Sequence, residues 1–199
     1  MNFPRISVNK QKILVISPIC DQIHKLEKIK EFGDQYVVIF TGEVCYPWDD
    51  LEQVQKRIEA MDSYLKEFSS FYVLGDSDLT FKNLNKNNVN DLNKWIDNQC
   101  LGVHITFGNS TMLTVVHGGI PAGAKGWNDI LSNIEVAFVR NINDKPWHNF
   151  YQGNYGYIIS AHPMTDEVTH YGLSSSIDVK NQVLAQEYDE NGLKRTILL

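Results

Sequence analysis

The chain has 199 residues, of which 43% are hydrophobic and 21% charged, and its formal net charge is −6. This length and composition are typical of one globular domain, so we predict a single domain over residues 1–199. The acidic balance argues against a general nucleic-acid binder, which usually carries a basic surface. The sequence has no apolar run of the roughly 18 residues that would predict a membrane span, and its first residues lack the apolar middle of a secretory signal.

The cysteines indicate a cellular compartment. Cys20, Cys45 and Cys100 are odd in number and widely spaced. This is neither a disulfide framework nor a paired zinc-ligand pattern, and it is usual in a reducing environment. We therefore expect a cytoplasmic protein.

The first 75 residues alternate between strand and helix patterns. Compact β-branched runs predict buried strands, and apolar residues at helical spacing predict the helices between them. The strands are expected at 12–17, 35–42 and 71–75, and the helices at 21–33 and 49–68. Gly33 is expected to end the first helix, and Asp49 or Asp50 to cap the second. This alternation favours a parallel sheet covered by helices.

The second half of the sequence has shorter and more varied elements. An Asn- and Lys-rich stretch, residues 79–95, is expected to form a surface loop with one or two helical turns. Gly108 and Asn109 predict a hairpin turn between two strands within residues 101–119. The remaining expectations are a helix at 127–139, a strand at 154–163, and short strands from 168 to the end. We therefore expect this half to be more antiparallel.

Residues able to bind a ligand follow several predicted strands. His117 precedes two glycines, His162 precedes a proline, and Gly-acid pairs place Glu43 and Asp76 at two other strand ends. Ligands bind at the carboxyl ends of strands in parallel sheets. A lone histidine is more often structural, and a carboxylate in such a loop is often a turn former or helix cap. Taken together, the four side chains form a mixed N and O set that suits zinc, manganese or iron.

Other polar residues lack this placement. His24 lies in a predicted helix beside lysines and is expected at the surface. The sequence has no phosphate-cradling glycine motif and no nucleophile elbow.

The order of these motifs resembles that of the calcineurin-like metallophosphoesterases, in the branch that holds serine/threonine phosphoprotein phosphatases and bis-nucleotide phosphatases. In that family the strand ends carry D-x-H, G-D-x-x-D, G-N-H-[DE], a histidine before glycine, and a late G-H or A-H. The matching stretches here are ISPIC, TGEVC, LGDSD, VVHGG and SAHP, and the similarity runs from about Lys12 to the C-terminus. The resemblance implies an α/β fold, a β-sandwich of mixed sheets flanked by helices.

The departures from the family pattern fall mainly on one half of its metal site. Pro18 and Cys20 stand where the family has the aspartate and histidine of the first metal. Ser77 stands where the family has its catalytic histidine, and serine is a poor proton donor at neutral pH. The arginine that often follows the second motif has no counterpart. The resemblance therefore implies that no catalytic residue remains.

The other half of the family's site is kept in altered form. Glu43 replaces the bridging aspartate, Asp76 replaces an asparagine, and His117 and His162 are unchanged. The resemblance implies that these four residues hold one divalent ion, Mn, Zn or Fe, or none.

Two functions follow from this pattern. In the first, the protein is a pseudophosphatase that binds a protein partner or a phosphorylated ligand. Tyr46, Pro47 and Trp48 are then a candidate contact patch, although an ordinary packed tryptophan is the alternative. In the second, the protein is a mononuclear metal-dependent phosphoesterase, with Asp78 or Asp21 as the nearby acids for proton transfer.

Overall fold

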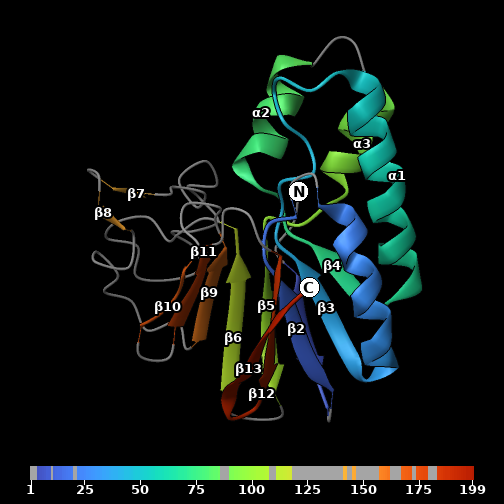
Figure 1. The fold of residues 1–199 in the computed structure, drawn as a ribbon. Coiled ribbons are helices and arrows are strands. Elements are labelled where there is room, and N and C mark those ends of the chain that lie inside the picture. The colour runs from blue at the N-terminus through green and yellow to red at the C-terminus, as the bar shows by residue number, and fades with distance from the viewer. Residues whose placement is uncertain are drawn as a thin grey trace.

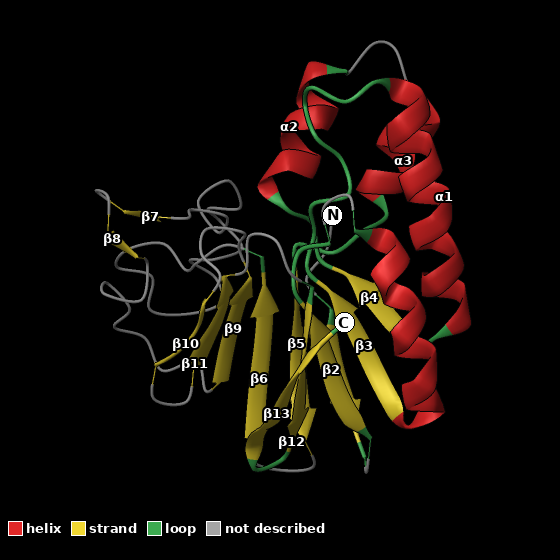
Figure 2. Ribbon diagram, viewed as in Figure 1, coloured by secondary structure: helices red, strands yellow, loops and turns green. Residues whose placement is uncertain are grey.

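Two mixed β-sheets face each other, and helices cover the outer face of one of them (Figure 1; Figure 2). The protein is represented by a computed structural model. It describes residues 4–9, 11–19, 22–85, 90–107, 111–117, 141–142, 145–146, 157–161, 167–171, 174–178 and 183–199.

The sheet beneath the helices has the strand order β13-β12-β2-β3-β4 in the described part of the chain. Its strands are β2 (Lys12–Ile16), β3 (Tyr36–Phe40), β4 (Ser70–Tyr72), β12 (Leu184–Asp189) and β13 (Gly192–Leu198). β2, β3 and β4 run parallel, as the sequence predicts, and β12 is antiparallel to β2 and to β13.

The second sheet has the order β1-β5-β6-β9-β11-β10 among the described strands. They are β1 (Arg5–Val8), β5 (Gly102–Phe107), β6 (Thr111–Val116), β9 (Tyr157–Ala161), β10 (Glu167–Tyr171) and β11 (Ser174–Asp178); β7 (Asn141–Ile142) and β8 (Lys145–Pro146) pair separately.

The pairing in this sheet corrects part of the expectation for the second half. β5 and β6 are antiparallel, which confirms the predicted pair of strands. However, β6, β9 and β11 run parallel to one another, so the sheet is less antiparallel than expected. β1 was not expected either. It is a short edge strand, and its parallel pairing with β5 involves residues about 100 positions apart, which local pattern cannot reveal.

Helix α1 (Leu51–Glu67) follows the sequence expectation closely. The Asp50 carboxylate accepts a hydrogen bond from the Gln53 backbone N–H at 2.8 Å and caps the helix start. Val54, Ile58 and Met61 are buried on one face, each stabilising the fold by about 1.5–3 kcal/mol through lost apolar exposure.

The first predicted helix is a 3₁₀ helix, η1 (Ile23–Gln35), interrupted at Gly33. Gly33 has a φ of +67°, a left-handed conformation that glycine adopts without a Cβ penalty. The position of the predicted stop is thus confirmed, although two more residues follow.

The Asn- and Lys-rich stretch is not a surface loop. Most of it lies in α2 (Asp76–Leu84) and α3 (Asn90–Asp97). Phe81, Leu92 and Ile96 are buried in the core beneath the helices, so tertiary packing outweighs the polar composition. The expectation was wrong because a few apolar residues at helical spacing are enough to anchor a short helix.

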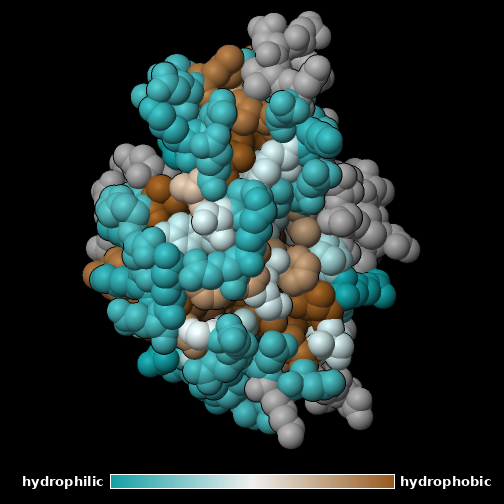
Figure 3. All heavy atoms as spheres, turned by 90° about the vertical axis from the view of Figure 1, so that its right-hand side faces the viewer, coloured by the Kyte–Doolittle hydropathy of each residue, from teal (hydrophilic) through white to brown (hydrophobic). Residues whose placement is uncertain are grey.

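Two hydrophobic cores follow from the alternation of side chains along the strands. In β2, Ile13 and Val15 face the other sheet, whereas Leu14 and Ile16 face the helices. Figure 3 faces the helical side and shows a mainly hydrophilic surface with smaller hydrophobic areas between. Among the described residues, no helix is long and apolar enough to cross a membrane.

Candidate functional site

The candidate site lies where strands of both sheets end at the same edge. β3 leads into residues 41–45, β4 leads into Val73–Gly75, and β6 leads into His117. Every residue from Thr41 to Cys45 is buried. Glu43 and His117, both expected at strand ends, therefore lie close together although their strands belong to different sheets.

Two glycines allow the loops after β3 and β4 to touch. A Cβ on Gly42 would lie 2.6 Å from the Gly75 backbone nitrogen and 2.9 Å from His117 Nδ1. Gly42 also has a φ of +81°, and Glu43, which is not glycine, has a φ of +71°. A left-handed glutamate costs free energy, so the surrounding contacts must hold it in place.

Asp78 supplies those contacts. Its carboxylate accepts hydrogen bonds from three consecutive backbone N–H groups, those of Glu43 at 3.2 Å, Val44 at 3.1 Å and Cys45 at 2.8 Å. It also accepts from the Gly75 N–H and from the Tyr72 hydroxyl, both at 2.9 Å. Asp78 is 0% exposed. It therefore fixes the loop after β3 from within.

The interior changes the acidity of the groups around this carboxylate. Burial, and then the charge of Glu43, raise the pKa of Asp78, while its backbone and Tyr72 hydrogen bonds oppose the rise. Burial and the nearby Asp78 also raise the pKa of Tyr72 and of the Cys45 thiol. Tyr72 and Cys45 thus stay neutral at physiological pH.

Two side chains contact the Glu43 carboxylate, one at each oxygen, but only one of the contacts is a hydrogen bond. The Ser77 hydroxyl donates to Oε2 at 3.0 Å, and His117 Nε2 lies 3.3 Å from Oε1. The other ring nitrogen of His117, Nδ1, is 2.7 Å from the Thr41 carbonyl oxygen, to which it donates. Glu43 and His117 are 1% and 0% exposed, and Ser77 is 7% exposed. The carboxylate is therefore enclosed by protein groups.

The remaining predicted residues are only partly described. Pro18 is buried beyond β2, where the neighbouring Ile19 N–H reaches the Gly42 carbonyl at 3.4 Å. Cys20, Asp21, His162 and the side chain of Asp76 lie outside the described residues, as do the helix expected at 127–139 and the turn at Gly108–Asn109.

The described residues fit one half of a metal site. A histidine whose Nδ1 donates to a backbone carbonyl has Nε2 oriented as in many metal sites, and Glu43 Oε1 lies beside it. Pro18, by contrast, has no side-chain donor for the first metal position. Among the described residues, no three His, Cys, Asp or Glu side chains form a set able to hold a metal ion.

Tyr72 and Thr41 are the contributors that sequence reasoning missed. Tyr72 lies at the end of an apolar strand and looks like an ordinary core residue, yet its hydroxyl binds Asp78 and accepts from the Val44 N–H at 3.1 Å. Thr41 supplies the carbonyl for His117. The signal that could have identified them is a polar group at the end of a buried strand, where Tyr72 and Thr41 both lie.

A cavity of about 530 Å³ lies elsewhere, at the opposite end of β2. It is lined by Val8, Asn9, Gln11, Lys12, Phe107, Asp189 and Glu190. Lys12 and Asp189 are already paired with Glu187 and Lys194. The cavity is therefore separate from the buried polar groups around Glu43.

Comparison with known proteins identifies the fold. No protein-family model and no curated protein sequence matches the chain. Among solved structures, a protein assigned as a diadenosine tetraphosphatase is similar, with a TM-score of 0.65, 13% identity, and coverage of 98% of this chain and 97% of that one. A protein serine/threonine phosphatase from Saccharomyces cerevisiae is similar with a TM-score of 0.53 and 13% identity, over 92% of this chain and 76% of that one. A cold-active protein-tyrosine phosphatase of a psychrophilic Shewanella is similar with a TM-score of 0.54 and 12% identity, over 98% of this chain and 82% of that one.

These similarities confirm the fold expected from the order of motifs. The chain has the calcineurin-like metallophosphoesterase fold, a mixed α/β architecture with helices flanking its sheets. At identities of 12–13%, these similarities establish the fold alone, and the activity has to be argued from the residues of the site.

Proposed function

We propose that the protein is a pseudophosphatase, which retains a metallophosphoesterase fold and acts by binding a partner rather than by cleaving a phosphate ester. The observation that carries this proposal is the enclosure of Glu43. One carboxylate oxygen accepts from Ser77, the other faces His117, and the residue is 1% exposed. A substrate phosphate would have to displace these contacts and enter beside a buried carboxylate.

The chemistry of the described residues supports the same conclusion. Two-metal catalysis clamps the attacking and leaving oxygens between two ions, and Pro18 removes a ligand from the first position. Ser77 replaces the general acid and uses its hydroxyl proton to bind Glu43. Asp78 is an unsuitable replacement acid because it is fully buried and accepts five hydrogen bonds from the fold.

A second candidate function rests on the geometry of His117. Its Nε2 and Glu43 Oε1 would be the described ligands of a single divalent ion, Mn, Zn or Fe, completed by Asp76 and His162. Such an ion would supply Lewis acidity toward a phosphoryl oxygen. In this alternative the protein is a mononuclear phosphoesterase, and the Thr41 carbonyl orients the histidine.

Turnover separates the two functions. The purified full chain is assayed with a generic phosphomonoester and a phosphodiester, with and without added Mn²⁺, Zn²⁺ or Fe²⁺, beside His117→Ala. We expect no metal-dependent turnover above that of His117→Ala, whether or not metal is bound. Metal at about one ion per chain, with turnover that His117→Ala abolishes, would establish the phosphoesterase instead.

The cysteines support the further proposal of a cytoplasmic location. Cys45 and Cys100 are both buried free thiols. Burial raises the pKa of Cys100 to about 11 and holds that of Cys45 well above its usual value, so neither is a reactive thiolate at neutral pH.

A further inference from the structure

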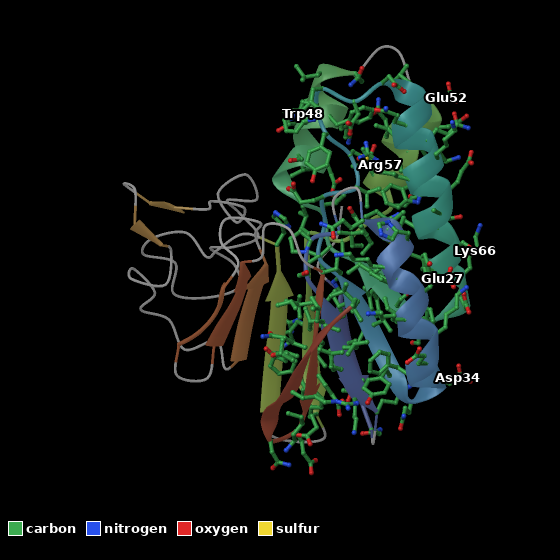
Figure 4. The ribbon with its side chains drawn as sticks, in the orientation of Figure 1. Glu27, Asp34, Trp48, Glu52, Arg57 and Lys66 are labelled. Carbon is green, nitrogen blue, oxygen red and sulfur yellow. The ribbon has the colours of Figure 1, made fainter. Side chains whose placement is uncertain are left out.

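The segment that follows the buried site presents an aromatic stack at the surface. Tyr46 and Trp48 lie nearly parallel, with ring centroids 5.0 Å apart and an interplanar angle of 17°. Trp48 is 77% exposed, so it is not the ordinary packed tryptophan of the alternative expectation. Figure 4 shows Trp48 near α2 and Arg57 toward α1, in the same upper part of the molecule.

The stack is held in place from behind. The Asp49 carboxylate accepts from the Tyr46 backbone N–H at 3.0 Å, and the Asp49 N–H donates to the Tyr46 carbonyl at 3.2 Å. Arg57 pairs with Asp49, and its guanidinium lies 5.6 Å from the centre of the Tyr46 ring. The side chains of Arg57 and Asp49 are only 15% and 11% exposed. Trp48 is therefore presented by a preorganised loop, which lowers the entropy cost of binding through it.

A rigid and exposed tryptophan is a characteristic anchor of protein interfaces. Tryptophan, tyrosine and arginine dominate binding energy where they occur at interfaces. A ring left this open in the free chain also exposes apolar surface that a partner would cover.

The aromatic rings and aspartates of residues 46–50 favour a cation as the group that would contact the Trp48 ring. Tryptophan is the best aromatic acceptor of a cation–π interaction. The chain already places one guanidinium on the neighbouring Tyr46 ring. Residues 46–50 include two aspartates and no basic residue, and only Asp49 is paired with Arg57. Asp50 and the whole-chain charge of −6 attract a cation and repel a phosphate.

We propose that the Tyr46–Trp48 stack is a docking site for a basic protein segment, with an arginine or lysine side chain of the partner lying on the Trp48 ring. This inference names the partner class of the proposed binding function and rests on it. It does not require a metal at Glu43 or access to that buried site.

The test uses a blocked six-residue peptide of alternating arginine and glycine as the probe, with a glutamine–glycine peptide of equal length as its control. The full chain is labelled with ¹⁵N at its tryptophan indoles, and Trp48→Phe assigns the Trp48 signal. We expect the arginine peptide to shift that signal and the glutamine peptide to leave it in place. Trp48→Ala should weaken peptide binding about ten-fold or more, and Trp48→Phe should weaken it less.

Leu198→Ala is the matched control, because Leu198 is also an exposed hydrophobic residue, at 56%, but lies on β13. It should bind the peptide as the wild type does. Equal peptide affinity in the wild type and Trp48→Ala would reduce the binding to general charge attraction and overturn the proposal. A single-stranded oligonucleotide that shifts the Trp48 signal in place of the peptide would also overturn it. Phosphoesterase turnover by the wild type would overturn the pseudophosphatase function. The peptide-binding result at Trp48 would still test the docking site separately.

Discussion

Two adjacent segments after β3 differ sharply in how they use their polar and aromatic groups. Residues 41–45 are all buried, and their backbone and side chains bind Asp78, Ser77 and His117. Residues 46–50 are half-buried or exposed, and they present the stacked Tyr46 and Trp48 to solvent. The inner segment satisfies most of its polar groups within the fold, with Glu43 Oε1 as a buried oxygen that accepts no hydrogen bond among the described residues, whereas the outer segment leaves an aromatic face open.

Under the proposed function, the inner segment contributes to stability and the outer segment contributes to binding. A buried polar group costs free energy unless it is hydrogen-bonded, and Asp78 and Ser77 provide most of these bonds for the inner segment. An exposed tryptophan contributes little to the fold. Substitutions should therefore affect stability in the inner segment and binding in the outer one.

The largest effect is expected from Gly42→Ala. Its new Cβ would lie 2.6–2.9 Å from the Gly75 backbone and His117 Nδ1, at a backbone φ of +81°. We expect the free energy of unfolding to fall by about 3 kcal/mol or more. Gly33→Ala is the matched control, because its φ is +67° but nothing lies within 4 Å of the new Cβ. It should cost less, about 1–3 kcal/mol, the strain of placing a side chain at a φ of +67° and a ψ of −170°. Equal losses in urea denaturation would show that the close contact is unimportant.

Asp78→Asn should give the next largest loss of stability. The neutral amide replaces a carboxylate oxygen with a donor facing the N–H groups of Glu43, Val44, Cys45 or Gly75. A loss of about 2–4 kcal/mol is expected in chemical denaturation. Asp50→Ala removes a carboxylate from the outer segment and should cost only about 1 kcal/mol, the value of a helix cap. A smaller loss for Asp78→Asn than for Asp50→Ala would contradict the distinction between the segments.

A carboxylate outside both segments should make the fold sensitive to acid. Burial acts to raise the pKa of Glu187, but hydrogen bonds from Lys12 and Arg195 outweigh it and lower that pKa. A lowered carboxyl pKa stabilises the folded state above the unfolded pKa, and this stability is lost as pH falls through the folded pKa. In Glu187→Gln, the free energy of unfolding should therefore fall less steeply as the pH drops below about 4.5. An unchanged acid limb in denaturation series would show that Glu187 is not the source.

Trp48→Ala should have the smallest effect on stability. Because Trp48 is 77% exposed, the free energy of unfolding should change by less than about 0.5 kcal/mol. Phe81→Ala is the buried comparison, at 0% exposure, and should cost about 3–5 kcal/mol. A large thermal destabilisation of Trp48→Ala would mean that the stack holds the loop rather than a partner.

Much of the fold could be predicted because it follows local rules. The apolar period of α1 and the Asp50 cap define its position, and the alternation of elements predicts the parallel β2, β3 and β4. The α2–α3 pair could not be predicted in the same way, since its anchors, including Phe81 and Ile96, are few among many Asn and Lys residues. β1 depends on a partner strand far along the chain.

The candidate site shows the same division. The placement of Glu43 and His117 directly after predicted strands indicates a common site, and the structure places His117 Nε2 3.3 Å from Glu43 Oε1 although the two strands belong to different sheets. The sequence did not predict the enclosure, because it depends on Ser77, Tyr72 and Asp78 turning inward from other elements. A polar residue at the end of a buried strand indicates a contact there, but the partner of that contact depends on how the whole chain packs.

The most direct test of the account is the accessibility of His117 in the native protein. His117 is 0% exposed, whereas His24 is exposed on η1 and provides an internal reference. The native chain is treated with diethyl pyrocarbonate, with and without inorganic phosphate, and the modified histidines are quantified by peptide mass spectrometry. We expect rapid modification of His24 and protection of His117 under both conditions. Modification of His117 at a rate close to that of His24 would show that the site is open and would contradict the enclosure on which the pseudophosphatase proposal rests.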